Sequence, residues 1–129
     1  MKNAEELEAK DRSPREWSGA FCGMPEPSVH VVAGRKEWEQ LWTAAFNSQP
    51  VPPVDFDRYF AIAVFLGSQP TGGYGVQFLE PLADAEKALI RYKVRKPGKG
   101  QFVIQAFTQP YAVKLYRRTG LKVSASEVP

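Results

Sequence analysis

Residues 59–66 read Tyr59-Phe-Ala-Ile-Ala-Val-Phe-Leu66, the longest apolar stretch of the 129-residue chain. The stretch is rich in aromatic and β-branched residues and is apolar at successive positions, which is typical of a strand that is buried on both faces. It is far shorter than the roughly 18 apolar residues that a membrane-spanning helix needs. The stretch therefore predicts the central strand of a sheet, and no membrane span is expected.

An amphipathic helix is expected just before this strand. Its apolar residues recur with a helical period: Trp38, Leu41, Trp42, Ala45 and Phe46. Gly34 is an acceptable N-cap, Asn47 and Ser48 follow the helix, and the prolines at positions 50, 52 and 53 prevent it from resuming. We interpret the aromatic face as core-facing, in preference to a cofactor site built from two tryptophans.

Alternation of apolar and polar residues predicts further strands over residues 17–22, 29–33, 74–78, 90–95, 102–107 and 111–118. No second helix recurs between them, so parallel βαβ units are not expected. The sequence predicts an α+β fold, with the helix packed on a mainly antiparallel, curled or barrel-like sheet of about five to seven strands. It also predicts a single domain over residues 17–121, between a polar N-terminal tail (1–16) and a C-terminal tail (122–129).

Charge is distributed unevenly along the chain. Residues 1–85 carry seven Lys/Arg and twelve Asp/Glu, whereas residues 86–122 carry ten Lys/Arg and a single acid, Glu86. This asymmetry can indicate a face that binds nucleic acid or another anionic polymer. The candidate anion-binding residues are Arg91, Lys93, Arg95, Lys96, Arg117 and Arg118. We prefer the plainer interpretation of a solvated basic face, because runs of charge are weakly specific.

Side chains suited to catalysis are few. The chain has one cysteine, Cys22, and one histidine, His30, whereas a typical zinc site takes about four ligands. Cys22 is interpreted as a small buried hydrophobic side chain, and Asp55 and Asp57 as loop caps. No catalytic residue, metal or cofactor is predicted, and an enzyme that uses Cys22, His30 or the two aspartates is the weakest interpretation.

The loop after the central strand reads Gly67-Ser-Gln-Pro-Thr-Gly-Gly-Tyr74 and is the candidate recognition site. Its glycines permit unusual backbone angles and close approach, Thr71 can hydrogen-bond, and Tyr74 can present a ring with a polar tip. The loop lacks the Lys-Ser/Thr ending of a phosphate-binding loop, and no helix pattern follows it. On the residues alone, a recognition loop and a merely tight hairpin are equally well supported.

Several short strings resemble the PrcB C-terminal domain family. They are Glu37-Trp38, Leu41-Trp42, Val54-Asp-Phe56, the Pro70-Thr-Gly-Gly-Tyr74 string and Pro110-Tyr111, and the resemblance extends over residues 29–118. The family is named after an accessory subunit of a bacterial surface protease complex, which supports the assembly or stability of the protease. Its members are usually exported or lipid-anchored, and none of their residues is assigned a catalytic role.

The resemblance implies a non-enzymatic, protein-binding accessory domain whose partner is a protein, with a protease as the candidate. The expected contact residues are Pro70, Thr71, Gly72, Gly73, Tyr74, Pro110 and Tyr111. Pro70, Thr71 and Gly72 are also similar to the Asn-Pro-Thr-Thr-Gly loop of chagasin-type protease inhibitors, although the leading asparagine is lacking. This narrower likeness leaves a protease inhibitor as an alternative, and fold-level analogy does not decide between the two.

The first ten residues, Met1-Lys-Asn-Ala-Glu-Glu-Leu-Glu-Ala-Lys10, contain no apolar segment of the kind found in signal peptides. As written, the sequence favours the cytoplasm. A location in the cell envelope or outside the cell is expected instead if an export signal has been removed. Localisation therefore stays open.

Overall fold

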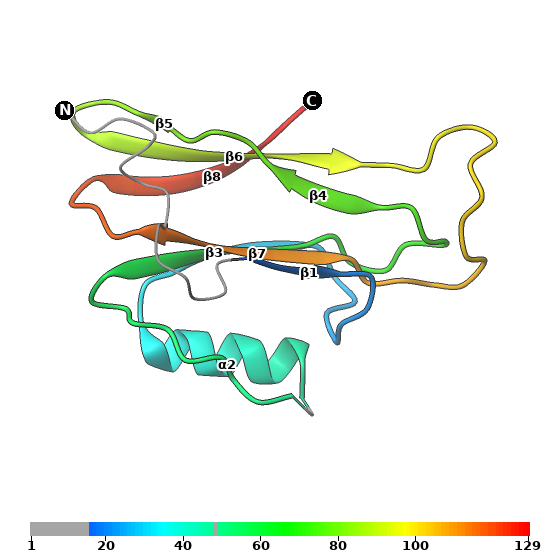
Figure 1. Ribbon diagram of the computed structural model, residues 1–129, viewed down its shortest axis with the longest axis horizontal. Helices are drawn as coiled ribbons and strands as arrows, with labels where there is room; N and C mark the ends of the chain where they lie inside the picture. Colours follow the sequence, from blue (N-terminus) through cyan, green and yellow to red (C-terminus); the bar gives the residue numbers. More distant parts are fainter. Residues whose placement is uncertain (1–15, 48) are drawn as a thin grey trace.

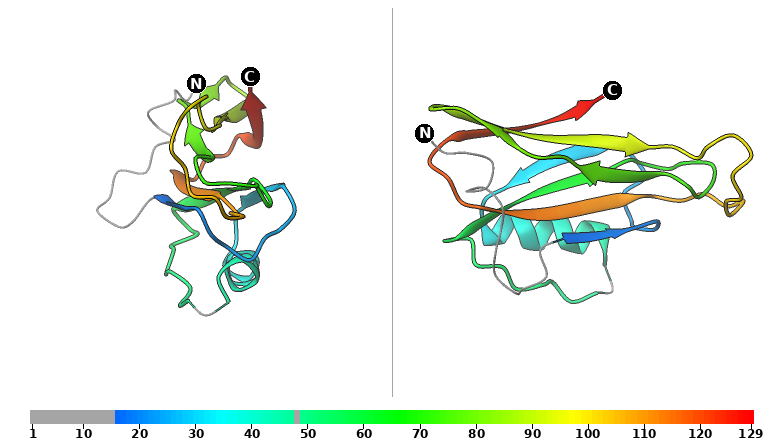
Figure 2. Two further views of the ribbon diagram at one scale, coloured as in Figure 1. Left: turned by 90° about the vertical axis from the view of Figure 1, so that its right-hand side faces the viewer. Right: turned by 45° about the horizontal axis from the view of Figure 1, so that its top comes forward.

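The computed structural model describes residues 16–47 and 49–129 and has an α+β architecture (Figure 1). Its elements, in chain order, are β1 (Glu16–Gly19), β2 (Ser28–Val32), α2 (Arg35–Ala45), β3 (Tyr59–Phe65), β4 (Gly75–Phe78), β5 (Leu82–Ala83), β6 (Lys87–Arg95), β7 (Tyr111–Arg117) and β8 (Lys122–Val128). They form three layers: α2, an inner sheet of β1, β2, β3 and β7, and an outer sheet of β4, β5, β6 and β8 (Figures 1 and 2). Of the expected tail over residues 1–16, residues 1–15 lie outside the described residues, as does Ser48 after the helix, and Glu16 is the first residue of β1.

β3 lies inside the inner sheet, whose strand order is β1-β7-β3-β2 and whose pairs are all antiparallel. All seven residues of β3 are buried, so the prediction of a strand buried on both faces is confirmed. Successive side chains of a strand point to opposite faces. Ala61 and Ala63 therefore pack in the cluster beneath α2, and Ile62 and Val64 pack against the outer sheet.

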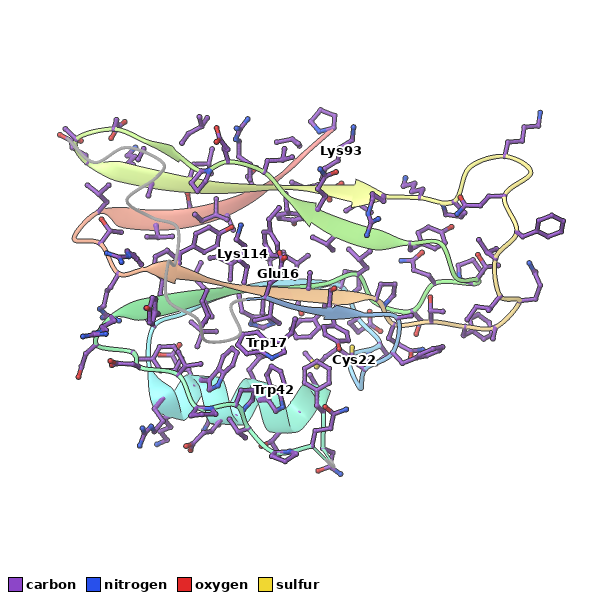
Figure 3. The ribbon with its side chains drawn as sticks, in the orientation of Figure 1. Glu16, Trp17, Cys22, Trp42, Lys93 and Lys114 are labelled. Carbon is purple, nitrogen blue, oxygen red and sulfur yellow. The ribbon has the colours of Figure 1, made fainter. Side chains whose placement is uncertain are left out.

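The helix α2 covers one face of the inner sheet with tryptophan side chains. Gly34, in an extended conformation, is its N-cap, and Trp38, Trp42 and Ala45 are buried. The Trp38 ring centroid lies 5.2 Å from that of Trp42 and 5.7 Å from that of Trp17 on β1. Figure 3 shows Trp17 and Trp42 between the sheet and the helix. No helix among the described residues is long and apolar enough to span a membrane.

The outer sheet is built around β6. β4 and β5 pair antiparallel with β6, and β8 pairs parallel with it, with Ile90 opposite Ala125. Residues 122–129 were expected to form a tail, and the structure corrects this by placing Lys122–Val128 in a strand of the domain. The local pattern, with serines between small apolar residues, is a weak strand signal. It becomes a strand because β6 offers a free edge and Val123 and Ala125 pack on the core.

The described residues form two sheets of four strands each, and no closed barrel, where a single curled or barrel-like sheet was expected. The sheets remain separate because β2 and β8, which lie near each other at the edges of the two sheets, do not pair. A second correction concerns residues 102–107, which form no strand. Alternation there predicts a half-buried face, but no layer of the domain covers Phe102 and Phe107, and Ile104 is half-exposed.

Candidate functional site

The candidate recognition loop, residues 67–74, is held against the connection between β6 and β7. Gln69 and Thr108 exchange two backbone hydrogen bonds of 2.8 and 2.9 Å, and the Gly72 amide donates to the Ile104 carbonyl at 3.0 Å. Residues 67–74 and 97–109 are called the loop pair below. Figure 1 shows both segments at the same end of the sandwich, beyond the ends of β4 and β6.

Gly72 and Gly73 of the recognition loop are required by this packing. A Cβ atom on Gly72 would lie 2.8 Å from Cγ1 of Ile104. Gly73 has a φ of +92°, which other residues rarely adopt, and a Cβ there would lie 2.8 Å from both Pro97 and Val103. Both glycines therefore allow two distant chain segments to meet.

Thr108 joins the two loops from the inside, and no sequence pattern predicts this role. Its side chain is completely buried, and its hydroxyl donates to the Thr71 carbonyl at 2.9 Å across 37 positions of the chain. A buried hydroxyl is stabilising only when it is hydrogen-bonded, so Thr108 holds the backbone of residue 71 in place. A lone threonine in an irregular segment has no pattern that could have revealed this role.

The expected contact residues differ in how much surface they present. Pro70 and Gly73 are exposed, Thr71 and Tyr74 are half-buried, and Gly72 is buried. The structure thus brings residues 70–74 together on one surface, with Gly72 beneath it.

Pro110 and Tyr111, the other part of the expected contact surface, lie mostly inside the molecule. Pro110 is fully buried, and its carbonyl accepts a hydrogen bond from the Leu66 amide at 3.0 Å. The Tyr111 ring packs against Phe46 with a centroid distance of 4.7 Å, and Gly19 leaves room for that ring. Burial raises the pKa of the Tyr111 phenol. Pro110 therefore holds the chain just before the recognition loop, and Tyr111 packs against the C-cap residue of α2.

A cavity of about 340 Å³ opens between the two sheets beside the recognition loop. Tyr74 lines it, together with Tyr92, Lys96 and Glu127 and with apolar side chains of β2 and β3. Burial, and to a lesser extent the nearby carboxylate of Glu127, raise the pKa of the Tyr92 phenol. Tyr74 therefore connects the exposed loop with a partly enclosed space.

The candidate anion-binding residues fall into two groups. On β6, the buried Ala88, Ile90 and Tyr92 alternate with side chains on the outward face, which are Lys87, Leu89, Arg91, Lys93 and Arg95. Lys93 stands on this outward face in Figure 3. The Arg91 guanidinium donates to the Glu80 carbonyl at 2.9 and 3.3 Å. Lys96 follows at the cavity.

Arg117 and Arg118 lie at the other end of the sandwich. Arg117 is opposite Tyr59, where β3 begins, whereas the recognition loop follows Phe65, where β3 ends. The Arg118 guanidinium donates to the carbonyls of Ala33 and Phe56 at 2.9 and 3.0 Å. The expected six-residue basic face is therefore not one continuous surface.

The groups considered for catalysis have structural partners. Burial raises the pKa of the Cys22 thiol, and a backbone hydrogen bond at Met24 offsets this only partly, so the nucleophilic thiolate is disfavoured. His30 Nε2 lies 3.0 Å from the Ser28 hydroxyl, and burial lowers the pKa of its ring. Cys22 and His30 share no hydrogen bond within residues 16–47 and 49–129.

The carboxylate of Asp55 organises the loop before β3. The Asp57 amide donates to Oδ1 of Asp55 at 3.0 Å, so the interpretation of Asp55 as a loop cap is confirmed. Oδ2 of Asp55 lies 3.7 Å from Nε of Arg58. In the part of the chain that the structure describes, no three His, Cys, Asp or Glu side chains gather as metal ligands would.

Residues 60–114 match the PrcB C-terminal family model. The expected resemblance is therefore confirmed over this segment, which is less than half of the chain. The segment runs from β3 into β7 and contains both halves of the loop pair, but not α2, β1, β2 or β8. No curated protein and no solved structure matches the chain.

Proposed function

We propose that this chain is a non-enzymatic protein-binding domain that serves as an accessory subunit of a protease complex. The observation that carries the proposal is the loop pair, which presents residues 70–74 at one end of the sandwich within the segment that matches the family model. The contact residues are Pro70, Thr71, Gly73 and Tyr74. Gly72 and Pro110 act from beneath by fixing the loop, and Tyr111 packs against Phe46 next to Pro110.

The construction of the loop favours recognition over a simple turn. A flexible loop loses conformational entropy when it binds, and a loop that is already fixed avoids much of that cost. Here the Gln69–Thr108 bridge, the bond from Gly72 to Ile104 and the buried Thr108 hydroxyl fix the backbone of residues 69–72 before any partner arrives. Recognition sites on loops that are held by a rigid scaffold are common in proteins.

Replacing Pro70 with glutamate and Tyr74 with alanine together is expected to weaken binding to the partner at least about tenfold, because contact residues at the centre of an interface carry most of its energy. The partner is first captured from lysate and envelope fractions of the native host, and its affinity is then measured with purified protein. Gln40→Ala, on the exposed side of α2, is the matched control. Equal affinity of the double variant and the wild type contradicts the proposal.

The same purified pair separates an accessory subunit from an inhibitor of the chagasin type. An accessory subunit maintains or prolongs peptide cleavage by the captured protease, whereas an inhibitor abolishes it when the loop occupies the cleft. Both roles use the exposed residues of the loop, so the activity of the protease, and not the affinity, decides between them.

A second candidate function is the binding of nucleic acid or another anionic polymer through the outward face of β6. Four cations lie there, Lys87, Arg91, Lys93 and Arg95, and the aromatic Tyr92 points to the opposite face. This arrangement suits contacts with phosphates more than stacking on bases.

For this second function we expect weak, sequence-independent binding to single strands that falls steeply with salt, with a log–log slope of about −0.7 for each phosphate contacted. Lys93→Glu is expected to weaken it strongly. Arg117→Glu is expected to weaken it much less, because Arg117 lies at the other end of the sandwich. Fluorescence anisotropy over a salt series measures both. Affinity that is independent of salt, or equal loss in the two variants, contradicts this function.

A further inference from the structure

The connection between β6 and β7 carries large apolar side chains that are exposed to solvent. Phe102 is fully exposed, Phe107 is 71% exposed and Ile104 is 52% exposed. Figures 1 and 2 show this connection projecting beyond both sheets along the long axis of the molecule. Large apolar side chains that cluster on a surface mark sites of interaction with proteins or membranes.

The projecting segment, residues 97–108, has a defined backbone and is called the tip. The Gln101 amide donates to the Gly98 carbonyl at 3.0 Å, and the Gly98 amide donates to the Gln101 side chain at 2.7 Å. Further along, Ile104 and Thr108 are hydrogen-bonded to the recognition loop. These hydrogen bonds hold the backbone on both sides of Phe102 and Phe107.

The charges within the tip and in the chain segment that leads into it are all positive. Lys99 lies within it, Arg95 and Lys96 precede it, and all three are exposed. From residue 87 to residue 126 the chain contains no aspartate or glutamate. The tip is therefore expected to attract negatively charged surfaces.

We propose that the tip binds the interface of an anionic lipid bilayer, with Phe102 and Phe107 entering the interface and Lys96 and Lys99 meeting the headgroups. Apolar side chains next to lysines suit this boundary, because the rings enter the apolar layer while the long side chains keep their charges in water. Anionic headgroups add an attraction for each lysine near the surface. This inference does not require the proposed protein partner.

The shape of the tip favours a bilayer over an acidic protein. A stable protein interface takes about 800 Å² from each partner with close shape complementarity. The tip instead offers a few apolar side chains at a narrow projecting end, and a bilayer interface accepts these at any point to a depth of about 5–10 Å. In this orientation the domain stands end-on, with α2 and the outward face of β6 alongside the long axis (Figure 2).

The test is co-sedimentation of the whole chain with vesicles of equimolar phosphatidylglycerol and phosphatidylcholine, compared with vesicles of phosphatidylcholine alone. We expect binding to the anionic vesicles only. The Phe102→Ser/Phe107→Ser variant and the Lys96→Glu/Lys99→Glu variant are each expected to bind about tenfold or more weakly. Lys36→Glu, at the start of α2 and the opposite end of the domain, is the matched control for charge and is expected to bind like the wild type.

Three outcomes overturn the inference. The first is wild-type protein that does not bind anionic vesicles. The second is full binding by the Phe102→Ser/Phe107→Ser variant together with loss in Lys93→Glu, which indicates electrostatic adsorption through the face of β6. The third is a tip variant that binds vesicles normally but loses the captured protein partner, which makes the tip a protein contact. Because Phe102 and Phe107 are exposed, replacing them is expected to leave the core intact. An unchanged thermal melting curve verifies this for each variant.

Discussion

A chain that ends at Leu121 is expected to lose about 3–6 kcal/mol of its free energy of unfolding, a large part of the 5–15 kcal/mol typical of a domain. β8 pairs with β6 over residues 87–93, and its Val123 and Ala125 pack on the cluster that contains Ile90. Removing β8 takes away these hydrogen bonds and contacts. It also leaves an edge of β6 unpaired, which favours aggregation.

Urea unfolding followed by tryptophan fluorescence measures this loss for the shortened chain. Removal of Pro129 alone is the matched control, since Pro129 follows the last residue of β8 and is exposed. If the shortened chain unfolds at the same urea concentration as the full chain, residues 122–129 are a tail, as their composition predicts, and not a strand of the domain.

Trp38→Ala is expected to lower the free energy of unfolding by about 3–5 kcal/mol, the range found when a large buried aromatic side chain is removed. Trp38 is 2% exposed and packs on Trp17, Trp42 and Phe56. Its indole Nε1 also donates to the Pro52 carbonyl at 2.9 Å, so the substitution leaves a cavity and removes a hydrogen bond.

Thermal unfolding followed by circular dichroism measures the effect. Trp38→Phe is expected to be milder, because the phenyl ring fills most of the space but does not replace the hydrogen bond. Gln40→Ala, exposed on the same helix, is expected to stay within about 0.5 kcal/mol of the wild type. A loss of less than about 1 kcal/mol for Trp38→Ala contradicts a helix that is packed on the inner sheet through this residue.

The candidate site was only partly visible in the sequence. Glycines in a row after a strand locate the recognition loop, because few residues tolerate the backbone angle of Gly73. Neither Thr108 nor the packing of Ile104 on Gly72 has a local signature, since each joins segments more than thirty positions apart. The exposure of Phe102 was also hidden, because alternation shows that a face is apolar but not whether anything covers it.

The sequence by itself determined the elements in which apolar side chains recur with a regular local period. Residues 59–65 are apolar at every position, and only a strand between two layers satisfies that pattern. Between residues 38 and 46, apolar side chains recur with a helical period, and the helix Arg35–Ala45 is found there. The resemblance to the PrcB C-terminal family likewise rests on short local strings.

Only the tertiary structure decided how these elements are paired. The division into two sheets, the parallel position of β8 and the separation of Arg117 and Arg118 from the cations of β6 depend on contacts between distant residues. A strand's period shows which of its faces is buried, but hydrogen bonds along its edges are the same for any neighbour. The partner of each edge is therefore settled by the packing of the whole core.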